Sequence, residues 1–256
     1  QGIDSRQAWA QRRPEVRRQF LEMLGLDPIP ARTPLNARIT GEFHREGYRV
    51  QNIVFQSQPG LYVTGNLYLP RPAAAGARYP AIVYVSGHSP GPAGAKVDYQ
   101  HHGIWFARNG YVAFLLDTIE FGEIPGIHHG IHNLSMWHWL SLGYTPAGVE
   151  VWNAIRALDY LETRSEADTS KAAITGISGG GAITWFTAAA DDRFQVAAPV
   201  LATWAVGPHV AGDTVAHNCD CIYFWNSYQL DLPIVGALIA PRPLKIMNAS
   251  KDGAFP

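Results

Sequence analysis

Two serines in this chain lie in the pattern Gly-x-Ser-x-Gly. One stretch reads Gly176-Ile-Ser-Gly-Gly180 and the other reads Gly87-His-Ser-Pro-Gly91. The pattern can hold a serine on a sharp turn between a strand and a helix, where its hydroxyl attacks a carbonyl carbon. The N–H of the next residue then stabilises the oxyanion that develops. Because Pro90 has no N–H, Ser89 is excluded from this role, and Ser178 is the predicted nucleophile.

The residues beside Ser178 suit a reactive serine. A short apolar run, Ala172–Thr175, predicts a strand before it, and Gly179–Ala190 predicts a helix after it. The Gly179 N–H is therefore the first predicted oxyanion donor, helped by the positive end of the helix. A tightly packed glycine turn, or a phosphate-binding loop, is the alternative interpretation of the same residues.

A second oxyanion donor is expected in a loop that follows another core strand. The run Ala81–Val85 predicts that strand, and the backbone N–H of His88 is the predicted donor, with the N–H of Ser89 as second choice. A plain loop after a core strand is the alternative.

A serine nucleophile needs a base, and the base needs an acid that orients it. Asp252 follows the predicted strand Leu244–Asn248 and is the predicted acid, although Asp-Gly is also a common turn. No histidine follows Asp252. We therefore expect the base in a segment beyond Pro256, with His217 or His209 acting out of the usual order as the alternative.

Several side chains are candidates for substrate contact. Glu120 lies in the irregular segment after a predicted strand and could meet substrate hydroxyls or cap nearby backbone, as could Asp117 and Glu123. Trp185 is predicted to contact substrate as part of an aromatic wall, and burial in the core is the alternative. Trp137 and Trp139 have the same two interpretations.

Six of the ten histidines lie between His101 and His138, but they predict no metal site. His128 and His132 have helical i, i+4 spacing, yet the nearby glycines argue against a helix, and no carboxylate stands at a zinc-ligand spacing. These histidines are instead expected to line the cleft. Cys219 and Cys221 are interpreted as buried thiols, because one intervening residue would strain a disulfide between them.

The elements that must position these residues form a consistent order. A helix over Arg6–Leu24, capped by Asp4 and stopped by Gly25, precedes a proline-rich connector that ends near residue 35. Three runs that favour antiparallel strands follow, at Ala37–Gly41, Tyr48–Phe55 and Leu61–Leu69. Beyond them strands alternate with helices, which predicts a mostly parallel sheet covered by helices on both faces. The predicted elements there are strands at 81–85, 111–116, 172–175, 196–202 and 244–248 and helices at 99–109, 147–164 and 179–190.

Length and composition exclude several classes. The chain has 256 residues with 20 Lys+Arg against 21 Asp+Glu, so no basic surface for nucleic acid is expected. No apolar run approaches the ~20 residues of a membrane span, and two cysteines are too few for a disulfide scaffold. We expect one folded domain over residues 36–256, with residues 1–35 as its helix and connector. Because the chain begins at Gln1, a processed product is expected, with a secreted or periplasmic location slightly favoured.

Longer stretches resemble bacterial α/β-hydrolases of the acetyl xylan esterase-like group, over about Pro34 to Pro256. The matching stretches are Gly143–Glu150, Trp152–Tyr160, Thr175–Gly181, Cys219–Cys221, and Ala240–Pro243 leading into Lys251-Asp252. Two departures are the absent terminal histidine and Ser86-Gly-His88 where relatives often carry His-Gly. The resemblance also implies a further C-terminal part, so we expect the domain to be incomplete at Pro256.

This resemblance implies a serine esterase that needs no cofactor and cleaves a small-molecule or carbohydrate ester through an acyl-enzyme, often by deacetylation. A serine peptidase or a lactone hydrolase of the same fold is an alternative. A carbohydrate-binding protein without catalysis on the same scaffold is another.

Overall fold

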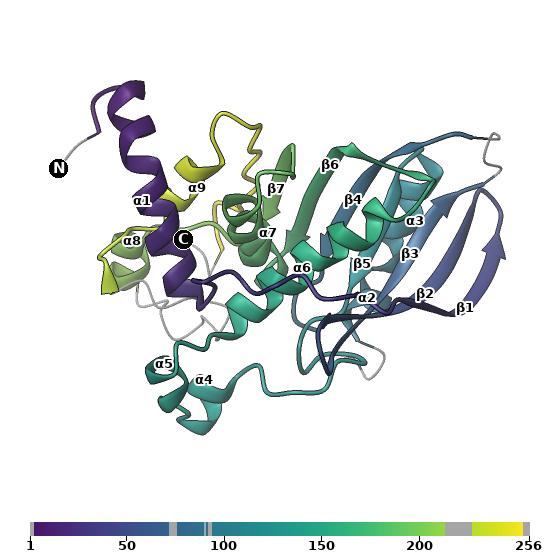
Figure 1. Cartoon of the computed structure of the whole chain (residues 1–256), viewed down its shortest axis with the longest axis horizontal. Helices are drawn as coiled ribbons and strands as arrows, with labels where there is room; N and C mark the ends of the chain where they lie inside the picture. The colour runs from purple at the N-terminus through teal and green to yellow at the C-terminus, as the bar shows by residue number, and fades with distance from the viewer. Residues whose placement is uncertain (1–2, 72–75, 90, 92–93, 213–226, 253–256) are drawn as a thin grey trace.

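The structure, a computed structural model, describes residues 3–71, 76–89, 91, 94–212 and 227–252 (Figure 1). Within them a seven-stranded mixed sheet has the order β1-β2-β3-β5-β4-β6-β7. The pairs from β1 to β5 are antiparallel, and β5, β4, β6 and β7 are parallel to one another. The strands are β1 (Arg38–Arg45), β2 (Tyr48–Gln58), β3 (Leu61–Pro70), β4 (Tyr79–Val85), β5 (Val112–Leu116), β6 (Ala167–Ile177) and β7 (Val196–Val200).

Helices cover both faces of this sheet, as the sequence predicted. In Figure 1, α6 crosses in front of the strands and α3 lies behind them. On the α6 side, α1, α7 and α9 complete the layer. The helices are α1 (Arg6–Leu24), α2 (Ala95–Asp98), α3 (Gln100–Arg108), α4 (Gly130–Leu134), α5 (His138–Ser141), α6 (Pro146–Glu162), α7 (Gly179–Ala190), α8 (Val206–Ala211) and α9 (Pro233–Ile239).

Alternation along each central strand divides its side chains between two cores. On β4, Val83 and Val85 face the large core under α6 and α7, whereas Ile82 and Tyr84 face the smaller core under α3. All five residues of β5 are buried. Strands covered on both faces read as continuous apolar runs, which is why the sequence revealed them. The α/β-hydrolase architecture predicted from the sequence is confirmed.

The first helix has the predicted bounds but a different cap. Ser5, rather than Asp4, is the N-cap, and its Oγ accepts a hydrogen bond from the Ala8 N–H at 3.1 Å. Gly25 ends the helix in the left-handed conformation, with φ of 75°. The ring of Phe20 meets Phe186 of α7 edge-on at 6.0 Å, so α1 is part of the large core.

Some predicted elements differ in extent. β6 begins at Ala167 and is longer than predicted, and the segment predicted as irregular after β5 contains the short helices α4 and α5. Among the described residues, no helix is both long and apolar enough to cross a membrane.

Candidate active site

Ser178 lies where β6 ends and α7 begins. Its backbone has φ of 58° and ψ of −127°, a conformation that residues with a side chain adopt rarely. The Ser178 N–H donates to the carbonyl of Val200 at the end of β7 (2.9 Å), and its own carbonyl accepts from Ala182 in the first turn of α7 (3.0 Å). The backbone is therefore held from both sides, and the serine is half-buried.

Neighbouring glycines allow this turn to approach β4. A Cβ on Gly176 would lie 2.2 Å from the Val85 carbonyl oxygen, and one on Gly180 would lie 2.1 Å from the same atom. A Cβ on Gly181 would lie 2.5 Å from the Val200 oxygen. All three contacts are to backbone, which cannot rotate away. The glycines of the motif are thus required by close packing.

The loop after β4 touches the serine turn, as predicted for the second oxyanion donor. A Cβ on Gly87 would lie 2.6 Å from the Ile177 oxygen and 3.3 Å from the Ser178 Cβ. His88 follows directly, so its backbone is at the same end of the sheet as Gly179 at the start of α7. The His88 ring stacks on that of Phe121, with centroids 4.9 Å apart.

A buried ion pair anchors this loop. Lys96 of α2 pairs with Asp117, which follows β5, and also with Glu123 at 2.7 Å. Asp117 further accepts a hydrogen bond from the Thr64 hydroxyl at 2.7 Å. Because the Asp117 side chain is wholly buried, it holds the end of β5 to α2 rather than facing a cleft.

The segment before Asp252 runs parallel to β7, but as two separate bridges instead of the predicted strand 244–248. Lys245 donates to the Ala197 carbonyl at 2.9 Å, and Leu201 donates to Met247 at 2.8 Å. Between these bonds Pro199 has no N–H to donate, so the ladder is interrupted there. Asp252 follows a few residues later, partly buried, beyond the same end of the sheet at which Ser178 lies.

Of the two alternative bases, His209 is described and His217 lies outside the described residues. His209 is buried in α8 with its ring 5.8 Å from that of Trp204. Cys219 and Cys221 also lie outside the described residues.

The two predicted substrate contacts, Trp185 and Glu120, lie in different surroundings. Trp185 is only 2% exposed and packs between Phe186 and Trp204, with centroids at 5.5 and 6.0 Å, so the core alternative holds for it. Trp137, by contrast, is 62% exposed, and Trp139 packs edge-on against Tyr144 at 4.8 Å.

Glu120 caps backbone, the second of its two predicted roles. Its Oε2 accepts from the His128 N–H at 2.6 Å and from the His129 N–H at 3.2 Å. Burial raises the pKa of Glu120, but these two N–H donors and the nearby imidazoles outweigh it, and the net pKa lies below its usual range. The carboxylate is thus occupied in holding the turn before α4.

We expect Glu120→Gln to lower the melting temperature at pH 7 by about 1–3 °C, because an amide oxygen accepts these N–H groups more weakly than a carboxylate. A lowered folded-state pKa means that the charge stabilises the protein above about pH 4.3 and stops doing so as pH falls through the folded value. The gap between variant and wild type should therefore narrow progressively as pH falls below about 4.3 in differential scanning fluorimetry. Glu46→Gln, at an exposed turn, is the control; a gap for Glu120→Gln that stays constant with pH would contradict the assignment.

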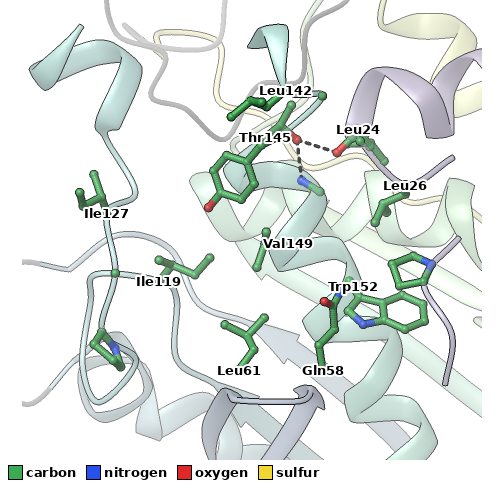
Figure 2. Close-up of a pocket in the computed structure, with 17 residues that line it drawn as sticks. Leu24, Leu26, Gln58, Leu61, Ile119, Ile127, Leu142, Thr145, Val149 and Trp152 are labelled. Atoms are coloured by element: carbon green, nitrogen blue, oxygen red, sulfur yellow. Dashed lines mark hydrogen bonds between the residues drawn. The ribbon is translucent and has the colours of Figure 1, made fainter. Parts of the chain in front are cut away.

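A pocket of ≈ 530 Å³ lies apart from the serine turn (Figure 2). The end of α1, the β2–β3 hairpin, the 119–127 segment and the start of α6 enclose it. At its rim the Thr145 hydroxyl donates to the Leu24 carbonyl at 2.8 Å and accepts from the Gly148 N–H at 2.9 Å. Its lining is largely apolar and includes Leu61, Ile119 and Val149, but neither Ser178 nor the 87–91 loop.

No protein-family model matches the chain. A Bacillus subtilis protein named "Putative hydrolase YtaP" is 25% identical over 252 residues, covering 90% of this chain and 78% of that protein. Methylesterase BT1017 superposes with a TM-score of 0.72 at 25% identity; the match covers 96% of this chain but 52% of the methylesterase, so the chain spans about half of that protein. A "putative acetyl xylan esterase" from Bacteroides fragilis has a TM-score of 0.73 at 17% identity, over 94% of this chain and 68% of that one. With its mixed sheet and these neighbours, the chain has the α/β-hydrolase fold, and the proteins that it resembles are named as esterases and hydrolases.

Proposed function

We propose that this protein is a serine carboxylic ester hydrolase. The observation that carries the proposal is the backbone of Ser178. This serine has φ of 58°, is held by hydrogen bonds on both sides and directly precedes a twelve-residue helix. This conformation is costly for a non-glycine residue and is found where a strand turns sharply into a helix to present a nucleophile.

The reaction follows from the groups around that serine. Ser178 Oγ attacks the carbonyl carbon of the ester while its proton passes to a base. The Gly179 and His88 N–H groups hold the negative oxygen of the tetrahedral intermediate. The intermediate collapses, the alcohol leaves with the proton, and water then releases the acid from Ser178 by the same steps.

Asp252 is proposed to orient the base, which is a histidine in this scheme. Its support is position, since the segment before it pairs with β7, and β7 in turn accepts the Ser178 N–H. None of the histidines that the structure describes is assigned as the base.

A carbohydrate ester is the proposed substrate class, and two chemistries are distinguishable. An acetyl esterase transfers the acetyl group to Ser178 and releases the sugar alcohol, the reaction that the sequence motifs favour. A methylesterase instead transfers the acyl group of a substrate methyl ester to the serine and releases methanol. The solved relative at 25% identity is named a methylesterase.

The experiment is active-site labelling of the full-length protein followed by product analysis. Incubation with a fluorophosphonate should add one adduct by intact mass, located on Ser178 by peptide mapping and absent from Ser178→Ala. Acetylated xylo-oligosaccharides and methyl-esterified oligogalacturonides are then compared by acetate and methanol release, with lactones and peptides as further substrates. Binding of sugar without adduct or turnover would instead support a carbohydrate-binding protein on this scaffold.

A further inference from the structure

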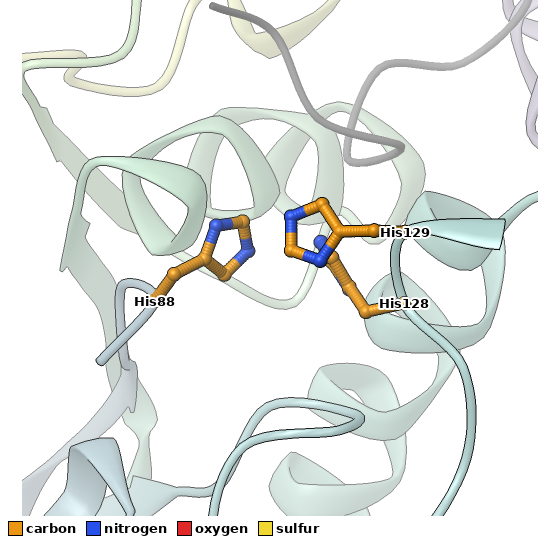
Figure 3. Close-up of side chains that lie close together, drawn as sticks. All are labelled: His88, His128 and His129. Carbon is orange, nitrogen blue, oxygen red and sulfur yellow. The ribbon is translucent and has the colours of Figure 1, made fainter. Parts of the chain in front are cut away.

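Three histidines from two distant segments converge (Figure 3). His88 follows β4, and His128 and His129 precede α4. Their ring centroids are 4.3 Å apart for His88 and His128, 4.6 Å for His128 and His129, and 5.4 Å for His88 and His129. Each ring offers one nitrogen that lies within 4.8 Å of the nitrogens offered by the other two.

We propose that His88, His128 and His129 bind a divalent transition-metal ion of the zinc class. In a tetrahedral site with metal–nitrogen bonds of about 2.0–2.1 Å, neighbouring nitrogens are about 3.4 Å apart. Since the nitrogens lie within 4.8 Å of one another, they need to close by at most about 1.4 Å on binding. His88 and His129 are partly exposed and lie outside regular elements, so small ring rotations are available to them.

Carboxylates lie near Nδ1 of two of the three rings. Glu150 Oε1 of α6 lies 3.1 Å from Nδ1 of His128, and both side chains are buried. Glu120 Oε2 lies 3.6 Å from Nδ1 of His129. A carboxylate beside Nδ1 favours the tautomer that carries its proton there and leaves Nε2 as the ligand atom, the arrangement in which protein histidines commonly hold metals.

Charge balance favours a cation at this point. Glu150 is 5% exposed, and a buried carboxylate is costly unless a positive charge compensates it. A dication on His128 would provide that compensation through the imidazole. Imidazole ligands suit zinc, copper, cobalt and nickel rather than calcium or magnesium, and three of them leave a fourth position for water or a ligand.

The fourth coordination position of the ion would lie near the serine turn. Gly87, next to His88, lies against Ser178, so the ion would stand at the edge of the proposed active site. It would not replace the histidine base of the proposed mechanism. The proposal does not rest on ester hydrolysis, and its test needs no ester.

The test uses metal-stripped full-length protein titrated with Zn²⁺ by calorimetry, and with Co²⁺ by visible absorption. We expect one equivalent of Zn²⁺ and the intense bands of tetrahedral Co²⁺. His88→Ala and His129→Ala should each weaken Zn²⁺ binding by about 100-fold or more, and Glu150→Gln by about 10–100-fold. Ser178→Ala should bind Zn²⁺ as wild type does, which separates this result from the outcome of the labelling experiment.

His101→Ala is the matched control, because His101 and His102 form an adjacent ring pair, with centroids at 4.0 Å, outside the proposed site. Its Zn²⁺ affinity should equal that of wild type. Circular dichroism verifies folding, and the partly exposed His88 and His129 keep the test usable if the buried His128 cannot be changed. Binding below one-tenth of an equivalent, or equal affinity in His88→Ala, His129→Ala and His101→Ala, would overturn the proposal.

Discussion

Ser178→Ala is expected to reduce kcat/KM for ester hydrolysis by about 10⁴-fold or more, with an unchanged melting temperature. In the proposed mechanism this side chain supplies the oxygen that forms the acyl-enzyme, and alanine has no such oxygen. The turn itself is held by backbone bonds to Val200 and Ala182, which alanine retains. Initial-rate assays on the ester of the panel that wild type hydrolyses fastest measure the loss of kcat/KM.

Ser89→Ala is the matched control for this result, because it changes the second Gly-x-Ser-x-Gly copy. Ser89 hydrogen-bonds the carboxylate of Asp98 on the exposed side of its loop, and its backbone N–H survives the substitution. We expect its kcat/KM within about threefold of wild type. If Ser178→Ala lowered kcat/KM by a similarly small factor, the proposed mechanism would be wrong.

Gly180→Ala is expected to destabilise the protein by about 3 kcal/mol or more, which lowers the melting temperature by roughly 6–12 °C. A Cβ there meets the Val85 oxygen at 2.1 Å and the carbonyl carbon of Ser86 at 2.6 Å. Both are backbone atoms at the end of β4, so α7 must move away from the sheet. The movement also displaces Gly179 and Ser178, and activity should fall with stability.

Gly236→Ala in α9 is the control, since it makes the same substitution within a helix. Its Cβ would meet only the Leu244 side chain, at an ordinary 3.6 Å. Alanine is the better helix former, so stability should stay the same or rise by up to about 1 kcal/mol. Thermal unfolding compares the two variants, and equal melting temperatures would show that the turn tolerates a Cβ.

Much of this fold could be predicted because its signals are local. The bounds of α1 and α7 follow from helical periodicity and from glycine and capping residues next to them, and β4 and β5 from short apolar runs. Ser178 was identifiable for the same reason: a strand, a glycine-flanked serine and a helix are consecutive in the chain. The cap of α1 was misplaced by one residue because Asp4 and Ser5 are both good caps.

Other features depended on residues far apart in the chain. From the sequence, Trp185 was equally compatible with a cleft or with the core. In the structure it is buried in the core, where it packs against Trp204. The role of Glu120 was decided by the return of the chain at His128 and His129, whose N–H groups it accepts.

The sequence by itself therefore determined the fold class and the strand–serine–helix turn at Ser178, since both are encoded by neighbouring residues. Only the tertiary structure brought His88 to His128 and His129. The physical reason is strand order: β4 and β5 are parallel neighbours, so the loops that follow them leave the sheet at the same end. Spacing along the chain contains no record of that adjacency, and side chains contributed by such loops meet only once the sheet has formed.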